Sequence, residues 1–72
     1  MKAYEKRMVE EYRELKERYD KLDAITVKAQ AGTLGFKLNC PLDLLLDQKR
    51  CMGEYLRCLK IRAEIEGVNI NG

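Results

Sequence analysis

Tyrosines and basic residues lie close together near the start of this 72-residue chain, a combination that can bind nucleotides. Tyr4 and Tyr12 are neighbours in sequence of Arg7, Arg13 and Lys16. An aromatic ring can stack on a nucleobase while nearby cations hold the phosphate. The alternative is that the tyrosines belong to a packed core and the basic residues to its solvated edge. The pattern therefore gives a candidate site for a small anionic ligand.

Lys28 is a second candidate, because it is the one charged residue in the stretch 24–34. A lone cation in such a stretch can extend its side chain to reach water, or it can be placed to meet an anion.

Catalytic and metal-binding patterns are weak in this sequence. It contains no histidine, and its three cysteines, Cys40, Cys51 and Cys58, form no CxxC pair. On one helix Cys51 and Cys58 would be roughly 10 Å apart, which is too far for a disulfide between them. A cysteine nucleophile would also need a base beside it. We therefore expect no catalytic residue, no metal and no cofactor, and we interpret the cysteines as small apolar packing residues in a reducing compartment.

The length and net charge of the chain further limit the class of protein to which it can belong. Seventy-two residues make one domain, 1–72, and a core of this size seldom supplies enough stability without a supplement such as oligomerisation. The net charge of +2 does not indicate a DNA-binding protein, although it suits a small anion. No signal core or membrane-spanning run is present, so the sequence predicts a soluble, intracellular protein without a membrane partner.

Hydrophobic spacing predicts an all-α fold, a two-helix antiparallel hairpin assembled as a homo-oligomer. Apolar residues recur every three or four positions over 2–30 and again over 41–66. The residues between them, 31–40, form a short glycine-containing loop. Gly67 should stop the second helix, and the tail 67–72 is expected to fray.

The second predicted helix is more apolar than a hairpin partner requires. One stripe, which can face the first helix, comprises Leu45, Met52, Leu56, Leu59 and Ala63. A second stripe, which needs another chain to cover it, comprises Leu44, Cys51, Tyr55, Cys58 and Ile65.

Three residues of the second predicted helix, Gly53, Tyr55 and Arg62, are notable for their place in this pattern. Tyr55, like Tyr19 in the first helix, favours core packing because it lies within an apolar stripe. Gly53 would cost about 1 kcal/mol in mid-helix relative to alanine, so it suggests a close helix crossing. Arg62 lies on the side of the second stripe, and it either approaches its symmetry mates around an anion or pairs with Glu66.

The segments 4–22 and 38–67 together resemble a known family, the small phage proteins with a helical-hairpin domain that act as anti-CBASS and anti-Thoeris sponges. The first segment carries a Y-x-x-R-hydrophobic-hydrophobic-x-E run, and the resemblance covers nearly the whole chain. The run that carries it in the second segment consists of Leu45, Gln48, Met52, Tyr55, Leu59 and Arg62.

This resemblance implies a phage protein in the cytoplasm of the infected bacterial host. It would bind cyclic oligonucleotide second messengers (cyclic di- or trinucleotides) without cleaving them, so that immune effectors are not activated. It also implies a homohexamer built as a trimer of dimers. Tyr12 and Lys28 match the aromatic and the lysine of the dinucleotide site, and Arg62 matches an arginine of a central trinucleotide pocket. Tyr4 and Arg7, together with Lys37, are substitutes for these ligand-binding positions.

Helix geometry adds a condition to this implied site. Tyr12 and Lys28 are sixteen residues apart, roughly 24 Å along one helix, and can share one small ligand only if antiparallel protomers supply one each. The alternative function is a small coiled-coil protein-interaction module or inhibitor with no nucleotide ligand.

Overall fold

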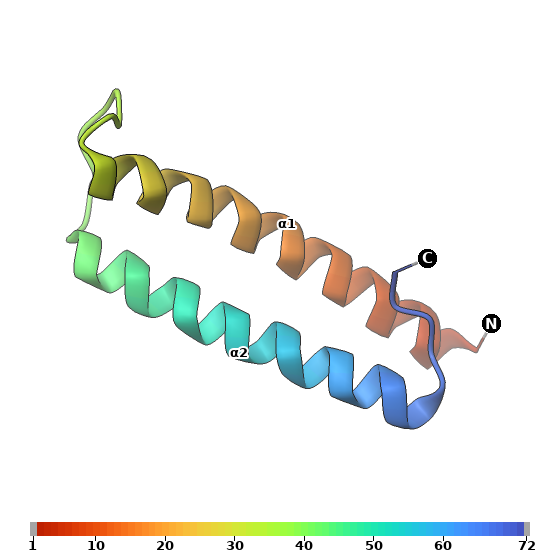
Figure 1. The fold of residues 1–72 in the computed structure, drawn as a ribbon. Coiled ribbons are helices and arrows are strands. Elements are labelled where there is room, and N and C mark those ends of the chain that lie inside the picture. Colours follow the sequence, from red (N-terminus) through yellow and green to blue (C-terminus); the bar gives the residue numbers. More distant parts are fainter. Residues whose placement is uncertain (1, 72) are drawn as a thin grey trace.

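Two antiparallel helices joined by one loop make up the fold. The structure, a computed structural model, describes residues 2–71, with α1 at Ala3–Ala31 and α2 at Leu42–Glu66. The helices run side by side along their whole length, and both chain ends lie at the end opposite the loop (Figure 1). The expected all-α helical hairpin is therefore confirmed. Within the described residues no helix has the length and apolar character needed to cross a membrane.

Each helix ends at a glycine that adopts a left-handed conformation. Gly32 has φ 78° and Gly67 has φ 69°, a backbone region that other residues rarely enter. The turn at Gly32 lets the Thr33 N–H donate to the Lys28 carbonyl at 2.9 Å, and the turn at Gly67 lets the Val68 N–H donate to the Ala63 carbonyl at 2.9 Å. These bonds satisfy carbonyls that the ends of the helices would otherwise leave free, so the predicted stop at Gly67 is confirmed.

The seam between the helices is a narrow apolar core. Leu59 is fully buried at its centre, with an exposed fraction of 0%. Thr26 is also fully buried, and its hydroxyl donates to the Asp23 carbonyl at 2.9 Å, so no unsatisfied polar group results. The other buried core residues are Met8, Tyr12, Leu15, Leu56, Ala63 and Val68.

The helices approach closely at Gly53, as its position in mid-helix suggested. A Cβ atom added to Gly53 would lie 3.3 Å from Cε2 of Tyr19, so the absence of a side chain leaves room for that ring. Four residues further along α1, the Asp23 carboxylate accepts a hydrogen bond from Lys49 Nζ at 3.0 Å and so joins the helices by an ion pair. Together these contacts set the register of the hairpin.

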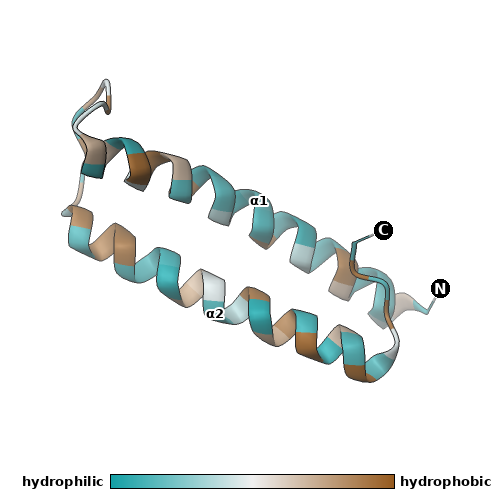
Figure 2. Ribbon diagram, in the orientation of Figure 1, coloured by the Kyte–Doolittle hydropathy of each residue, from teal (hydrophilic) through white to brown (hydrophobic). Residues whose placement is uncertain are grey.

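The second stripe of α2 lies outside this core. Figure 2 shows hydrophobic residues recurring along the whole of α2, whereas much of α1 is hydrophilic. Tyr55 is 44% exposed, and Cys51 and Cys58 are exposed, because α1 covers only one side of α2. Tyr55 therefore does not pack in the core of the hairpin, and it lies with the two cysteines in the stripe that is expected to need another chain to cover it. Tyr19, by contrast, is half-buried against the core, as expected.

The C-terminal tail also differs from the expectation that it frays. Val68 is only 7% exposed, and Ile70 packs against the core cluster. The tail turns back from the end of α2 and crosses α1 (Figure 1). It does so because Val68 and Ile70 supply apolar side chains where the core would otherwise be open to water. Gly72, the last residue of the expected tail, lies outside the described residues.

Replacement of Val68 by alanine tests whether the tail stabilises the hairpin. Val68→Ala should lower the free energy of unfolding by about 1.5 kcal/mol, since two buried methyl groups are lost. Urea denaturation followed by circular dichroism, at one fixed protein concentration, measures this change. Val27→Ala is the matched control, because Val27 is 55% exposed. Equal effects of the two substitutions would contradict the packed tail.

A double-mutant cycle tests the contact between Gly53 and Tyr19. On propensity alone Gly53→Ala should stabilise α2 by about 1 kcal/mol. We expect much less in the natural protein, because the new Cβ would press on the Tyr19 ring at 3.3 Å. In a Tyr19→Ala background the full gain should appear in the free energy of unfolding. Additive substitutions would show that the ring does not restrict Gly53.

Candidate functional site

Three adjoining hollows lie around the N-terminal half of α1, the C-terminal half of α2 and the tail. The largest, about 590 Å³, lies between α1 and the tail; the next, about 440 Å³, lies between α2 and the tail; and one of about 230 Å³ lies between the helices. They share lining residues, so they form one continuous concave surface. We call its inter-helix part the cationic groove, which is defined by Tyr12, Lys16, Tyr19, Gly53, Arg57 and Lys60.

Helical spacing explains why these side chains gather on one side. Gly53, Arg57 and Lys60 follow each other at steps of four and three, which is the spacing of neighbours on one helix face. On α1, Tyr12, Lys16 and Tyr19 have the same steps. Gly53 has no side chain, and this lets the Tyr19 ring lie against α2 between the two rows.

The cations of the groove differ in how they are neutralised. Lys16 Nζ donates to both carboxylate oxygens of Asp20, at 3.1 and 3.3 Å. These hydrogen bonds and the negative charge of Asp20 raise the pKa of the Lys16 ammonium above its ordinary value. Arg57 and Lys60, by contrast, make no ion pair with any residue in the described range 2–71. Their charge is therefore available to an anion.

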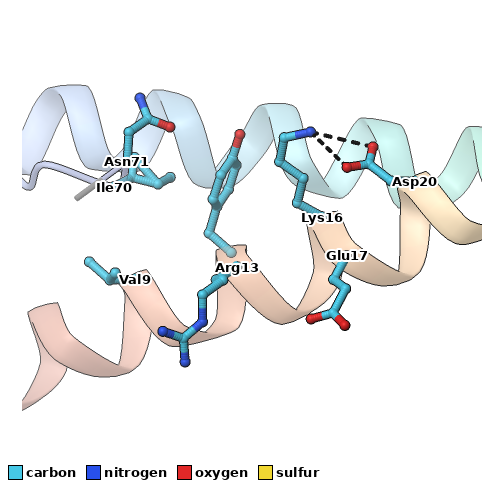
Figure 3. A pocket seen from close by; sticks show the side chains of 8 residues that line it. Val9, Arg13, Lys16, Glu17, Asp20, Ile70 and Asn71 are labelled. Carbon is cyan, nitrogen blue, oxygen red and sulfur yellow. Dashed lines mark hydrogen bonds and ion pairs between the residues drawn. The ribbon is translucent and has the colours of Figure 1, made fainter.

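Figure 3 shows how the largest hollow is arranged. Lys16 and Asp20 point toward each other, whereas Arg13 and Glu17 extend in the opposite direction. Its remaining lining residues include Val9 on α1 and Ile70 and Asn71 on the tail. This hollow thus has an apolar part at Val9 and Ile70 and a charged part in which two basic and two acidic side chains balance.

Tyr12 lies at the boundary of two hollows, but it is also part of the core. Its exposed fraction is 5%, so the ring forms a wall of the groove and does not present an open face for stacking. Tyr19, half-buried against Gly53, lines the groove beside it.

The other predicted site residues lie elsewhere on the hairpin. Lys28 is exposed, and it is roughly 24 Å along α1 and about 160° around the helix from Tyr12. Arg62 is exposed and pairs with Glu66 at 3.4 Å, the alternative considered for it. Tyr4, 43% exposed, and Arg7, also exposed, do not line the groove. One hairpin therefore brings none of these four residues to Tyr12.

Sequence reasoning missed the members of the groove that α2 and the tail contribute. Arg57 and Lys60 were not singled out, although their spacing from Gly53 could have indicated a basic row beside a gap. Ile70 and Asn71 had no such signal, because a short tail does not reveal where it folds back. Among residues 2–71 no cluster of metal-ligating side chains is present.

Comparison with known proteins gives one match. The model of the Sequestin family matches residues 2–65, which is most of the chain. No curated protein and no solved structure matches the chain.

The ion pair at the groove predicts a specific change in titration. Asp20→Asn should lower the pKa of Lys16, since it removes the carboxylate whose hydrogen bonds and charge raise it. NMR titration of the Lys16 side-chain carbon next to the ammonium reads this pKa directly. Glu14→Gln is the control, because Glu14 pairs with Arg18 at 3.5 Å and not with Lys16. An unchanged Lys16 pKa in Asp20→Asn would show that the pair does not persist in solution.

Proposed function

This chain belongs to the Sequestin family, and we propose that it binds and sequesters cyclic oligonucleotide second messengers without cleaving them. The family name describes sequestration, and the sequence resembles the anti-CBASS and anti-Thoeris sponges of phages. In this proposal the protein acts in the cytoplasm of the infected bacterium. It lowers the free concentration of the cyclic di- or trinucleotide, so the immune effector is not activated.

The observation that carries the proposal is the cationic groove. Arg57 and Lys60 make no ion pair within residues 2–71, and they lie beside tyrosine side chains in one hollow. Phosphodiesters need such cations, and the rings and apolar wall suit a nucleobase. Neutral ligands would gain little from this surface, which favours an anionic nucleotide over an uncharged metabolite.

A role for each residue follows from its position. Arg57 can donate two parallel hydrogen bonds to one phosphate, while Lys60 adds a point charge beside it. Lys16 can contribute a further charge when it turns from Asp20 to the ligand. Tyr19, which is half-buried, can lie against a base, and the buried Tyr12 only supports the wall behind it. No bond is made or broken, and the function depends on affinity alone.

Sequestration requires tight binding, because the protein competes with an effector. A nanomolar dissociation constant corresponds to about −12 kcal/mol. One phosphate contact and one base contact give only a few kcal/mol each, so a shallow groove on a single hairpin needs further contacts. We propose that a homo-oligomer, in the form of a hexamer made of three dimers, supplies them. Lys28, Arg62, Tyr4 and Arg7 would then reach ligand from other protomers.

The exposed second stripe of α2 favours a different function, a protein-interaction module. Leu44 and Ile65 are 57% and 79% exposed, and they belong to one stripe with the exposed Tyr55, Cys51 and Cys58. Exposed apolar patches mark interaction surfaces. In that case the protein would bind a host or phage protein through α2 and would not bind nucleotides.

Native mass spectrometry distinguishes these two functions. The purified protein is mixed with a panel of cyclic dinucleotides, cyclic trinucleotides and cyclic ADP-ribose isomers. We expect whole-number additions of one ligand class, and ligand of unchanged mass after the protein is denatured. A protein that stays free of ligand across the panel would overturn the proposal, and ligand of altered mass would show catalysis.

Substitutions in the groove test its role once a ligand is known. Arg57→Ala and Lys60→Ala should each weaken binding about 10- to 100-fold by isothermal titration calorimetry, since each removes a charge-assisted contact of about 1.5–3 kcal/mol. Arg18→Ala is the matched control, because Arg18 is exposed and does not line the groove. Wild-type affinity in both groove variants would place the site elsewhere, with Lys28 and Arg62 as the next candidates.

A further inference from the structure

The two tyrosines of the cationic groove differ in burial, although they occupy equivalent places on α1. Tyr12 and Tyr19 are seven residues apart, so they lie on nearly the same side of the helix. Both pack at the seam, yet Tyr12 is 5% exposed whereas Tyr19 is only half-buried. α2 even gives Tyr19 the room left by Gly53. The additional cover over Tyr12 therefore comes from outside the helix contact that both rings share.

The C-terminal tail supplies this cover. It crosses α1 near the N-terminal end of that helix (Figure 1), and Ile70 packs against the core cluster to which Tyr12 belongs. Ile70 and Asn71 line the 590 Å³ hollow together with Val9 and Tyr12. Tyr19 lies two turns closer to the loop, and no tail residue lines the hollow that it borders.

Beyond Val68 the tail is attached to the helices by apolar packing alone. The Val68 N–H donates to the Ala63 carbonyl at 2.9 Å, and the Val68 side chain is 7% exposed, so this residue is anchored. After it, the only hydrogen bond within the described residues joins the tail to itself, from the Asn71 N–H to Oδ1 of Asn69 at 3.2 Å. The half-buried Ile70 side chain is therefore what holds the end of the tail against the helices.

We propose that the end of the tail, residues 69–71, is a strap that lifts off α1 while Val68 stays in place, and that its lifting uncovers the Tyr12 ring. A segment held by one half-buried side chain opens more readily than either helix, because few buried contacts have to break. Gly67, with φ 69°, already reverses the chain before Val68, so α2 need not unwind. The 5% exposure of Tyr12 is then a property of the closed strap.

The strap deepens the proposed function and rests on it for the identity of the ligand. Ile70 and Asn71 line both the 590 Å³ and the 440 Å³ hollow, so lifting the strap joins the two. The uncovered Tyr12 ring adjoins Lys16 and Lys60, with which it lines the hollow between the helices. A nucleobase can stack on this ring while the cations hold its phosphate. Strap and ligand then compete for one ring, so the apparent affinity depends on the open fraction.

The solvent exposure of each tyrosine ring tests the strap without any ligand. The full chain is studied by NMR with a neutral gadolinium chelate, whose paramagnetic relaxation enhancement of ring protons grows with their exposure. In Ile70→Ser, which loosens the strap, we expect the enhancement at Tyr12 to rise to the level of Tyr19, while that of Tyr19 stays unchanged. Asn69→Gly removes the hydrogen bond within the tail and leaves every core side chain in place, so it should shift Tyr12 in the same direction.

A matched substitution separates opening of the strap from loosening of the whole hairpin. Ile25→Ser is this control, because Ile25 is half-buried on α1 near the loop, at the end away from the tail. A Tyr12 ring that stays protected in both tail variants would overturn the proposal, since the helices alone would then bury it. An equal rise at Tyr12 in Ile25→Ser would overturn it as well.

Binding of cyclic di-AMP, used as the probe, distinguishes the strap from the proposed function. By isothermal titration calorimetry Ile70→Ser should bind the probe about fivefold more tightly than the natural protein, the shift expected when the burial of half an isoleucine side chain no longer holds the strap closed. Unchanged or weaker binding would overturn the competition between strap and ligand. An uncovered Tyr12 ring in a protein that binds no cyclic nucleotide would support the strap and overturn the proposed function.

Discussion

Two helices can bury only one side of each other, and the structure of this protein depends on that constraint. The seam contains Leu59 at its centre and a single row of partners on α1. This seam provides the stability of the hairpin. It also limits that stability, because two helices form no second layer of core. The tail adds Val68 to the open end of the seam, and Ile70 packs against the same core. The side chains outside the seam are exposed and can contact other molecules.

The seam divides the exposed surface of α2 into two parts with different chemistry. On one side Arg57 and Lys60 line the cationic groove with Tyr12 and Tyr19. On the other side an apolar row from Leu44 to Ile65 has no cover within the hairpin. The two parts of the α2 surface therefore differ in chemistry, one basic and one apolar.

Gly53 connects the seam to the groove. The missing side chain gives the Tyr19 ring room to pack against α2. The cost in helix propensity, about 1 kcal/mol, is thus compensated by packing and by the shape of the groove. The ion pair between Asp23 and Lys49 holds the same register one turn away. Small shifts of one helix along the other would misalign Arg57 and Lys60 with the tyrosines.

Hydrophobic spacing in the sequence determined the two helices and the surplus apolar row on α2, and Gly67 determined the end of the second helix. These features are local, because a helix repeats every 3.6 residues and its stop signals lie next to it. The family resemblance also predicted Tyr12 as a ligand-binding residue, together with Lys28. Only the tertiary structure decided that Tyr12 is buried and that Arg57 and Lys60 face it. Those facts depend on the register between two segments that are far apart in the chain. It also decided that the tail folds back onto α1, since a few apolar residues do not specify the surface that receives them.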